Sequence, residues 1–394
     1  MHGRAIITLF TVCMLVGGCD RAAAVPDFAT RDSAGVRIVE SARQEWKEGD
    51  QWTVSSTPLL EIGVTEGELP YELSRVTGAT RLSDGGIVIG NGHTNELRFF
   101  DAGGAHVRTV GRSGGGPGEY EYMRKLMSCG PDSIAAFDLH WQLKVYDRSG
   151  KLSRETRLHQ PGSERTPYAL SCGPSGHFVI TGWGAETRES RIGFYQATSP
   201  VYLLDRRGEG MAELGEFVSS ERIGSERGSR PHPLGRSTVL ALSSDEIFVA
   251  TGETPEVRTY GFDGAPRRIL RAPSRDLRIT DEDLDRFRQA QMEPVPDHLR
   301  PAAERELLEM PMPERFPATS ELLLDADGNL WMRHFTRPGE PKPRWGIFSL
   351  EGRYLGELET PEGVRVLEIG TDYLLGLHRD ELNVERARVY SLQK

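Results

Sequence analysis

Two short segments combine residue types and spacing that could support chemistry. Residues 111–115, Gly-Arg-Ser-Gly-Gly, match the Gly-x-Ser-x-Gly pattern of a serine nucleophile. Such a nucleophile needs a sharp turn from a strand into a helix, whereas strand and turn signals stand on both sides of this segment. Pro117 also stands where the helix of a dinucleotide-binding loop would begin. We therefore expect a tight crossing between two strands, in which the glycines adopt positive φ.

Residues 325–329, Asp-Ala-Asp-Gly-Asn, have the acidic and glycine spacing of a calcium-binding loop. They lack the distal glutamate that completes the oxygen cage of such a loop. The sequence favours a hairpin turn at this position.

Polar side chains that close a series of apolar strands form a third candidate site. A metal-dependent hydrolase would need several carboxylate or amide ligands around one cation, and only Asn91, Asp138 and His334 qualify. This mixed set does not predict a metal centre, and no cofactor is expected. We predict instead a binding rim of polar and aromatic loop residues, namely Asn91, His93, Asp138, His140, Trp141, Trp183, Arg333, His334 and His378. Each histidine taken alone is typical of a surface or hydrogen-bonded loop residue.

The elements that position these residues are strands, because a paired phrase recurs six times. Its first half is a turn followed by an apolar strand, as in residues 84–89, and its second half is an alternating run that often ends in Asp-x-x-Gly, as in residues 97–104. Period-two alternation with turn residues throughout predicts four antiparallel strands per unit, which is typical of a propeller blade. We predict an all-β fold over residues 58–394, a six-bladed β-propeller of four-stranded antiparallel blades.

The sixth unit stops after its third strand, so the N-terminal part of the chain is expected to supply the fourth strand and close the ring. Residues 59–63 are the favoured segment, because the sequence that follows them parallels the one that follows the first blade. Residues 32–39, which also have a turn-then-strand form, are the alternative.

An insertion at residues 271–320 interrupts the spacing between the fourth and fifth blades. Thr280 is expected to cap a helix with three acidic residues in its first turn, and Pro294 ends it. A second helix is expected to start near Pro301 and to bury Ala303, Leu307 and Met310. Such an insertion is either a lid or docking arm over one face, or a segment packed against the outside of the ring.

The blade phrases, the loop at residues 111–120 and residues 325–331 resemble the six-bladed β-propeller family of bacterial secreted proteins and lipoproteins, which is NHL-like and TolB-like. The resemblance covers the chain from about Leu73 to its C-terminus. It implies a propeller and an envelope location, and it implies no reaction.

The N-terminus has the pattern of a lipoprotein signal peptide at residues 1–18. Arg4 supplies the positive charge, residues 5–16 the apolar run, and Val16-Gly17-Gly18-Cys19 resembles a lipobox. Acylation of Cys19 would anchor the chain on the periplasmic side of the inner or outer membrane, with residues 19–57 as a tether and lead-in. Ordinary cleavage after residues 22–24 is the alternative.

Two further cysteines, Cys129 and Cys172, occupy equivalent places in neighbouring blades. Export permits a disulfide. Matching positions on adjacent blades can lie beyond the Cα separation of about 7 Å that a bridge tolerates. Two free buried thiols are therefore expected, with the bridge as the alternative.

Composition narrows the class of partner. The chain of 394 residues has a formal net charge of −10 and no basic run, which argues against nucleic acid. We interpret the protein as a monomeric, non-catalytic binding or scaffold module for an envelope protein, peptide or glycan. The alternative is a metal-dependent propeller enzyme, a lactonase-like hydrolase or a lyase, with its site in the central channel.

Overall fold

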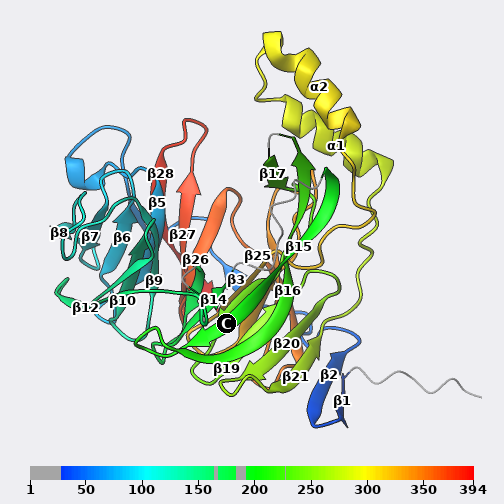
Figure 1. Ribbon diagram of the computed structural model, residues 1–394, viewed down its shortest axis with the longest axis horizontal. Coiled ribbons are helices and arrows are strands. Elements are labelled where there is room, and N and C mark those ends of the chain that lie inside the picture. The colour runs from blue at the N-terminus through cyan, green and yellow to red at the C-terminus, as the bar shows by residue number, and fades with distance from the viewer. Residues whose placement is uncertain (1–27, 164–166, 183–191, 227) are drawn as a thin grey trace, which may run out of the picture.

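The structure, a computed structural model, describes residues 28–163, 167–182, 192–226 and 228–394. The described chain is mostly β and forms six sheets that follow one another along the sequence (Figure 1). The predicted signal peptide, Cys19 and Trp183 lie outside the described residues. Among the residues described, no helix has the length and hydropathy required to span a membrane.

Three of the sheets have the four antiparallel strands that the repeat predicts. The first sheet contains β5 (Val76–Arg81), β6 (Ile87–Asn91), β7 (Glu96–Phe100) and β8 (His106–Val110). The second contains β9 (Met123–Ser128), β10 (Ile134–Asp138), β11 (Gln142–Tyr146) and β12 (Leu152–Arg157). The fifth contains β22 (Glu321–Leu324), β23 (Leu330–Arg333), β24 (Arg344–Phe348) and β25 (Tyr354–Glu359).

The fourth and sixth sheets recruit strands from the N-terminal part of the chain. In the fourth, β18 (Val239–Leu242), β19 (Glu246–Ala250), β20 (Glu256–Gly261) and β21 (Pro266–Arg271) are extended by the hairpin β1 (Phe28–Ser33) and β2 (Val36–Ser41). In the sixth, β26 (Val364–Ile369), β27 (Tyr373–Arg379) and β28 (Glu385–Gln393) are joined by β3 (Thr53–Val54) and β4 (Leu60–Ile62).

The two candidate N-terminal strands therefore have different partners. β4 pairs antiparallel with β28, with Ile62 opposite Ala387, as expected for residues 59–63. The strand part of the alternative segment, residues 36–39, lies in β2, and β2 pairs parallel with β21 in the fourth sheet. Residues 32–39 therefore do not complete the sixth sheet.

Each sheet packs face to face on its neighbours, and this explains why the middle strands are buried on both faces. All five residues of β10 are buried, whereas the outer strand β12 alternates between half-buried and exposed side chains. Six apolar clusters lie between consecutive sheets; one of them joins Ile89 and Phe100 of the first sheet to Leu375 and Val389 of the sixth. The first strands of the sheets also contact one another in chain order, and β26 contacts β5.

The third sheet departs from the repeat in a way that the sequence did not indicate. It contains β13 (Tyr168–Cys172), β14 (Phe178–Thr181), β15 (Gly193–Leu204), β16 (Gly210–Ser225) and β17 (Gly228–Pro231). β14 pairs with only Val201–Leu204 of β15, while β15 and β16 continue their own ladder as far as Gly193 opposite Gly224. A long two-stranded extension therefore projects from this sheet.

The helical insertion packs against that extension. α1 (Asp281–Met292) has the predicted cap, in which Thr280 Oγ1 accepts a hydrogen bond from the Asp283 N–H and the Thr280 N–H donates to the Asp283 carboxylate. α2 (Arg300–Glu309) follows a 3₁₀ turn, η2 (Asp297–Leu299). Phe287 and Leu307 of the helices form one cluster with Leu234, and Ile223 of β16 packs against it. Figure 1 shows α1, α2 and β17 rising together from one end of the molecule.

The expected turns and crossings are present. Gly111, Gly114 and Gly118 have φ of 83°, 152° and 73°, so residues 111–120 form the tight connection predicted between β8 and β9. At residues 325–329, the Asp325 carboxylate accepts hydrogen bonds from the N–H groups of Asp327 and Asn329, which makes this segment a hairpin turn between β22 and β23.

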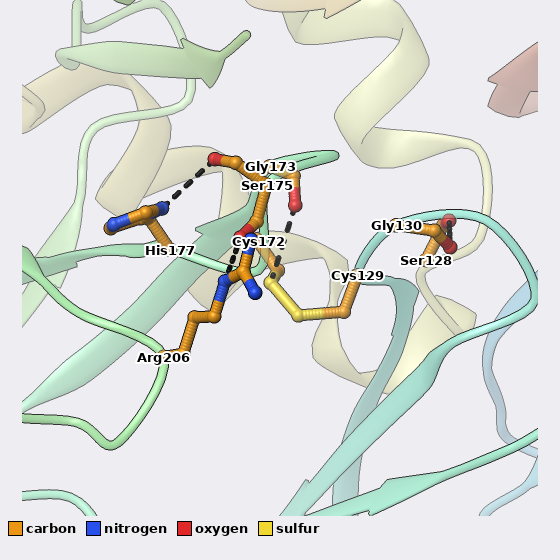
Figure 2. Close-up of a disulfide and its surroundings, with 8 residues drawn as sticks. All are labelled: Ser128, Cys129, Gly130, Cys172, Gly173, Ser175, His177 and Arg206. Atoms are coloured by element: carbon orange, nitrogen blue, oxygen red, sulfur yellow. Dashed lines mark hydrogen bonds between the residues drawn. A yellow bond between two sulfur atoms is a disulfide. The ribbon is translucent and has the colours of Figure 1, made fainter. Parts of the chain in front are cut away.

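Cys129 and Cys172 form a disulfide (Figure 2). Their Cα atoms lie 5.0 Å apart, because the C-terminal ends of β9 and β13 converge. The expectation of two free thiols is wrong, since neighbouring first strands lie closer together than sequence spacing could show.

We expect Cys129→Ser with Cys172→Ser to lower the free energy of unfolding by about 2–4 kcal/mol, because the bridge restricts the unfolded chain. Differential scanning calorimetry with and without reductant measures this loss. Reductant should lower the melting temperature of the wild type alone. Equal melting temperatures for the oxidised wild type and the double variant would contradict the prediction.

Candidate functional site

A cavity of about 430 Å³ opens at the end of the molecule where the first strands begin. Four basic side chains line it, those of Arg75, Arg124, Lys125 and Arg365, together with the rings of Tyr122, Phe137 and Trp141. None of the described Asp or Glu residues lines this cavity. We call it the basic pocket.

The basic pocket draws its residues from three sheets. Arg75 directly precedes β5, Arg124 and Lys125 lie in β9, and Arg365 is the second residue of β26. Arg124 and Arg365 are exposed, while Arg75 and Lys125 are half-buried. The sheets thus bring together basic residues that lie far apart in the sequence.

Three residues of the pocket have strained backbones. Arg75, Tyr122 and Trp141 have φ of 54°, 72° and 64°, in the left-handed region that favours glycine. Of the non-glycine residues described, only seven have positive φ, and these three line one pocket. Such strain amounts to about 1–3 kcal/mol for each residue and concentrates at functional sites.

The strained conformations are held by two of the predicted rim residues, Asn91 and Asp138. Asn91 Oδ1 accepts a hydrogen bond from the Ser74 N–H at 2.8 Å, next to Arg75. Asp138 Oδ1 accepts from the N–H groups of His140 and Gln142, at 2.9 and 3.1 Å, on either side of Trp141. Both side chains are buried and position the pocket from behind.

The turn that carries Trp141 is also joined to Tyr122. The Leu139 N–H donates to the Tyr122 carbonyl at 3.1 Å, and the Trp141 N–H donates to the Asp138 carbonyl at 3.1 Å. These bonds fix the two aromatic residues relative to each other.

Cationic groups and rings alternate along the wall. The Arg75 guanidinium carbon lies 3.8 Å from the Tyr122 ring centroid, and that of Arg124 lies 5.9 Å from the Trp141 ring. Trp141 stacks on Phe137 with 5.0 Å between centroids. Stacking orients the guanidinium planes and leaves their N–H edges available to an acceptor.

The floor of the pocket is a layer of charges. Burial lowers the pKa of Lys125, the Glu321 carboxylate opposes that shift, and the Arg365 guanidinium adds to it. Burial raises the pKa of Glu321, against the effect of Arg333, Arg365 and Lys125. Arg333 Nη1 lies 3.4 Å from Glu321 Oε2. Arg333 therefore belongs to the charge layer.

A larger cavity of about 960 Å³ continues from the floor, lined by residues of all six first strands or the turns that follow them. Thr77, Lys125 and Arg365 line both cavities. The two cavities thus lie on either side of one charged layer in the channel between the first strands.

The remaining rim residues are not brought together with the pocket. His93 is exposed, and the exposed His140 lies 2.8 Å from the Glu121 carboxylate. His334 Nε2 lies 3.3 Å from Glu357. Burial, with the charges of Arg388 and Arg386, lowers the pKa of His378. Of the predicted rim residues that the structure describes, Trp141 alone lines the basic pocket.

Asp138 and His334 are the strongest candidates for a metal site from the sequence. Asp138 Oδ2 lies 3.3 Å from Nζ of the buried Lys144. His334 Nε2 lies 3.3 Å from Glu357, but both ring nitrogens are buried without a hydrogen-bond partner among the described residues. In the described part of the chain, no three His, Cys, Asp or Glu side chains are grouped as a metal site. The insertion at residues 271–320 contributes none of the residues that line the basic pocket.

Sequence reasoning missed Arg75, Tyr122, Arg124, Lys125 and Arg365. It considered the ends of the second strands, whereas these residues lie at the start of the first strands. The available signal was the presence of charged residues inside apolar first-strand phrases, as in Met-Arg-Lys-Leu-Met of β9 and Val-Arg-Val-Leu of β26.

No family model and no curated protein matches the chain. Among solved structures, it is similar to a Bacteroides fragilis protein described as exported, with 13% identity, a TM-score of 0.47, and coverage of 89% of this chain and 97% of that one. It is also similar to a DUF4221 family member from Bacteroides vulgatus, with 9% identity, a TM-score of 0.46, and coverage of 87% and 99%. For virginiamycin B lyase from Staphylococcus aureus the identity is 11%, the TM-score 0.41, and the coverage 87% and 100%. At these values the similarity identifies neither a ligand nor a reaction.

The His334–Glu357 pair predicts a pH dependence of stability. Burial alone would raise the pKa of Glu357, but the neighbouring His334 ring, the charge of Arg275 and a hydrogen bond from the Tyr354 hydroxyl lower it to about 2. Because the pKa is lower in the folded chain than in the unfolded one, this carboxylate stabilises the fold above the ordinary Glu pKa, and the contribution is lost as pH falls towards about 2.

The free energy of unfolding can be measured by chemical denaturation at about pH 6 and at steps down to about pH 2. At about pH 6 the wild type should be more stable than Glu357→Gln, and this difference should shrink below about pH 4. Glu359→Gln, which removes an exposed carboxylate in the same strand, is the control and should show no such trend. A constant difference over the whole range would rule out the ion pair.

Proposed function

We propose that this chain is an exported, lipid-anchored, six-bladed β-propeller of the NHL-like, TolB-like kind, which acts as a non-catalytic binding module. The six sheets would be the blades, and β4 would complete the sixth blade and close the ring. The cluster that packs the sixth sheet on the first, and the pairing of β4 with β28, support this arrangement.

The observation that carries the binding function is the basic pocket. Its wall combines basic side chains, aromatic rings and three strained backbones. Strain of this kind persists only where the surrounding structure enforces it, here through the side chains of Asn91 and Asp138. We infer that it serves to present Arg75, Tyr122 and Trp141 to a glycan, a peptide or a protein segment in the cell envelope.

Tyr122 offers the sharpest test, because strain and ligand contact can be separated there. It is 52% exposed, so its removal leaves no cavity in the core. Tyr122→Gly relieves the left-handed backbone and Tyr122→Ala does not, so the glycine variant should be the more stable by about 0.5–1 kcal/mol. Both variants lose the ring, and both should bind at least tenfold more weakly to the glycan or peptide that the wild type selects from arrays of envelope components.

Arg148→Gln, which changes an exposed side chain in the turn between β11 and β12, is the control and should bind as the wild type does. Binding that survives in both Tyr122 variants would contradict the proposal, as would turnover of the selected ligand by the purified wild type.

The anchor is tested separately. If Cys19 is acylated, the wild type should incorporate labelled palmitate and sediment with membranes, whereas Cys19→Ser should do neither. A membrane-free wild type cleaved after residues 22–24 would support ordinary secretion in place of the anchor.

A further inference from the structure

We infer that the ligand of the basic pocket is an acidic saccharide that carries at least two negative charges. This inference rests on the proposed binding function and names the class of ligand.

The charge of the pocket requires a ligand with more than one negative group. Arg75 and Arg124 form no ion pair with any described residue, and each lies against an aromatic ring. At the floor, the Glu321 carboxylate pairs with Arg333, and Arg365 forms no ion pair with any described residue. The pocket thus keeps a positive excess, although the chain as a whole has a formal net charge of −10.

The arrangement of the cations favours carboxylate groups that are spaced along a ligand. Arg75, Arg124 and Arg365 come from three different sheets around the pocket, so one small anion cannot neutralise all three guanidinium groups. Arginine forks bind carboxylates through paired N–H donors, and such charge-assisted bonds are shorter and stronger than neutral ones. A chain of uronate units would offer several carboxylates along its length to these guanidinium groups.

The aromatic rings favour a ring-shaped scaffold. Tyr122 is 52% exposed beside Arg75 and offers its ring face, while the buried Trp141 lines the wall and is fixed by its stacking on Phe137. Flat, rigid side chains provide contact area to the C–H face of a sugar with little loss of conformational entropy. The cavity of about 430 Å³ is also within the usual size of small-ligand sites.

An acidic peptide that binds by strand addition fits less well, because that mode needs free backbone groups at a strand edge. At the mouth of the pocket those groups already have partners. The Val76 N–H donates to the Glu385 carboxylate at 2.6 Å, and the Met123 N–H donates to Asn95 Oδ1 at 2.8 Å. Recognition is left to side chains.

Isothermal titration calorimetry on the detergent-solubilised exported chain tests the inference with three probes, trigalacturonate, the neutral galactotriose and tetra-aspartate. Trigalacturonate should bind at least tenfold more tightly than either of the others, and its affinity should fall as salt is raised. Arg75→Gln and Arg124→Gln should each weaken it at least tenfold. Arg148→Gln, which changes an exposed arginine in the turn between β11 and β12, should leave it unchanged.

Each other outcome overturns the inference in a different way. Equal binding of galactotriose would reject the charge requirement and leave the proposed binding function standing. Equal binding of tetra-aspartate would reject the saccharide. Failure of all three probes would reject the ligand class, while the array experiment with the Tyr122 variants decides the binding function independently. Trigalacturonate binding that survives Arg75→Gln and Arg124→Gln would place the ligand outside the basic pocket.

Discussion

The packing of every sheet between two others is the constraint on which the rest of the structure depends. A sheet that buries both faces needs a neighbour on each side, and the sixth sheet satisfies this need by packing on the first. In that arrangement the first strands of neighbouring sheets lie close together. Their proximity brings Cys129 within bonding distance of Cys172, and it places basic residues of the first, second and sixth sheets around one opening. The candidate site is therefore a product of the packing between neighbouring sheets.

Local hydrogen bonds then refine what the packing assembles. Asn91 and Asp138 end the second strands of two neighbouring sheets, and each accepts hydrogen bonds from backbone N–H groups next to a strained residue. The buried Lys144 balances the charge of Asp138. Asn91 and Asp138 thus support the pocket from behind, and the side chains that line it include basic groups and aromatic rings.

Much of the fold could be predicted from the sequence, because turns and alternation are local signals. The strand phrases, the capped helix at Thr280 and the turn at Asp325 are all determined within a few residues. The pocket could not be predicted in the same way. Arg124 and Lys125 look like ordinary polar positions of a half-buried strand, and only the contact with neighbouring first strands makes them line a cavity. The extension of β15 and β16 was missed because its alternating pattern merges with that of the strand it prolongs.

The central claim is that the basic pocket holds an acidic ligand between its guanidinium groups and its rings. A crystal structure of the chain from residue 28 onward, grown with saturating trigalacturonate, tests it most directly. The account predicts carboxylate density within hydrogen-bond distance of Arg75 or Arg124, with a sugar ring against Tyr122 or Trp141. An empty pocket with the ligand bound elsewhere on the molecule would contradict it.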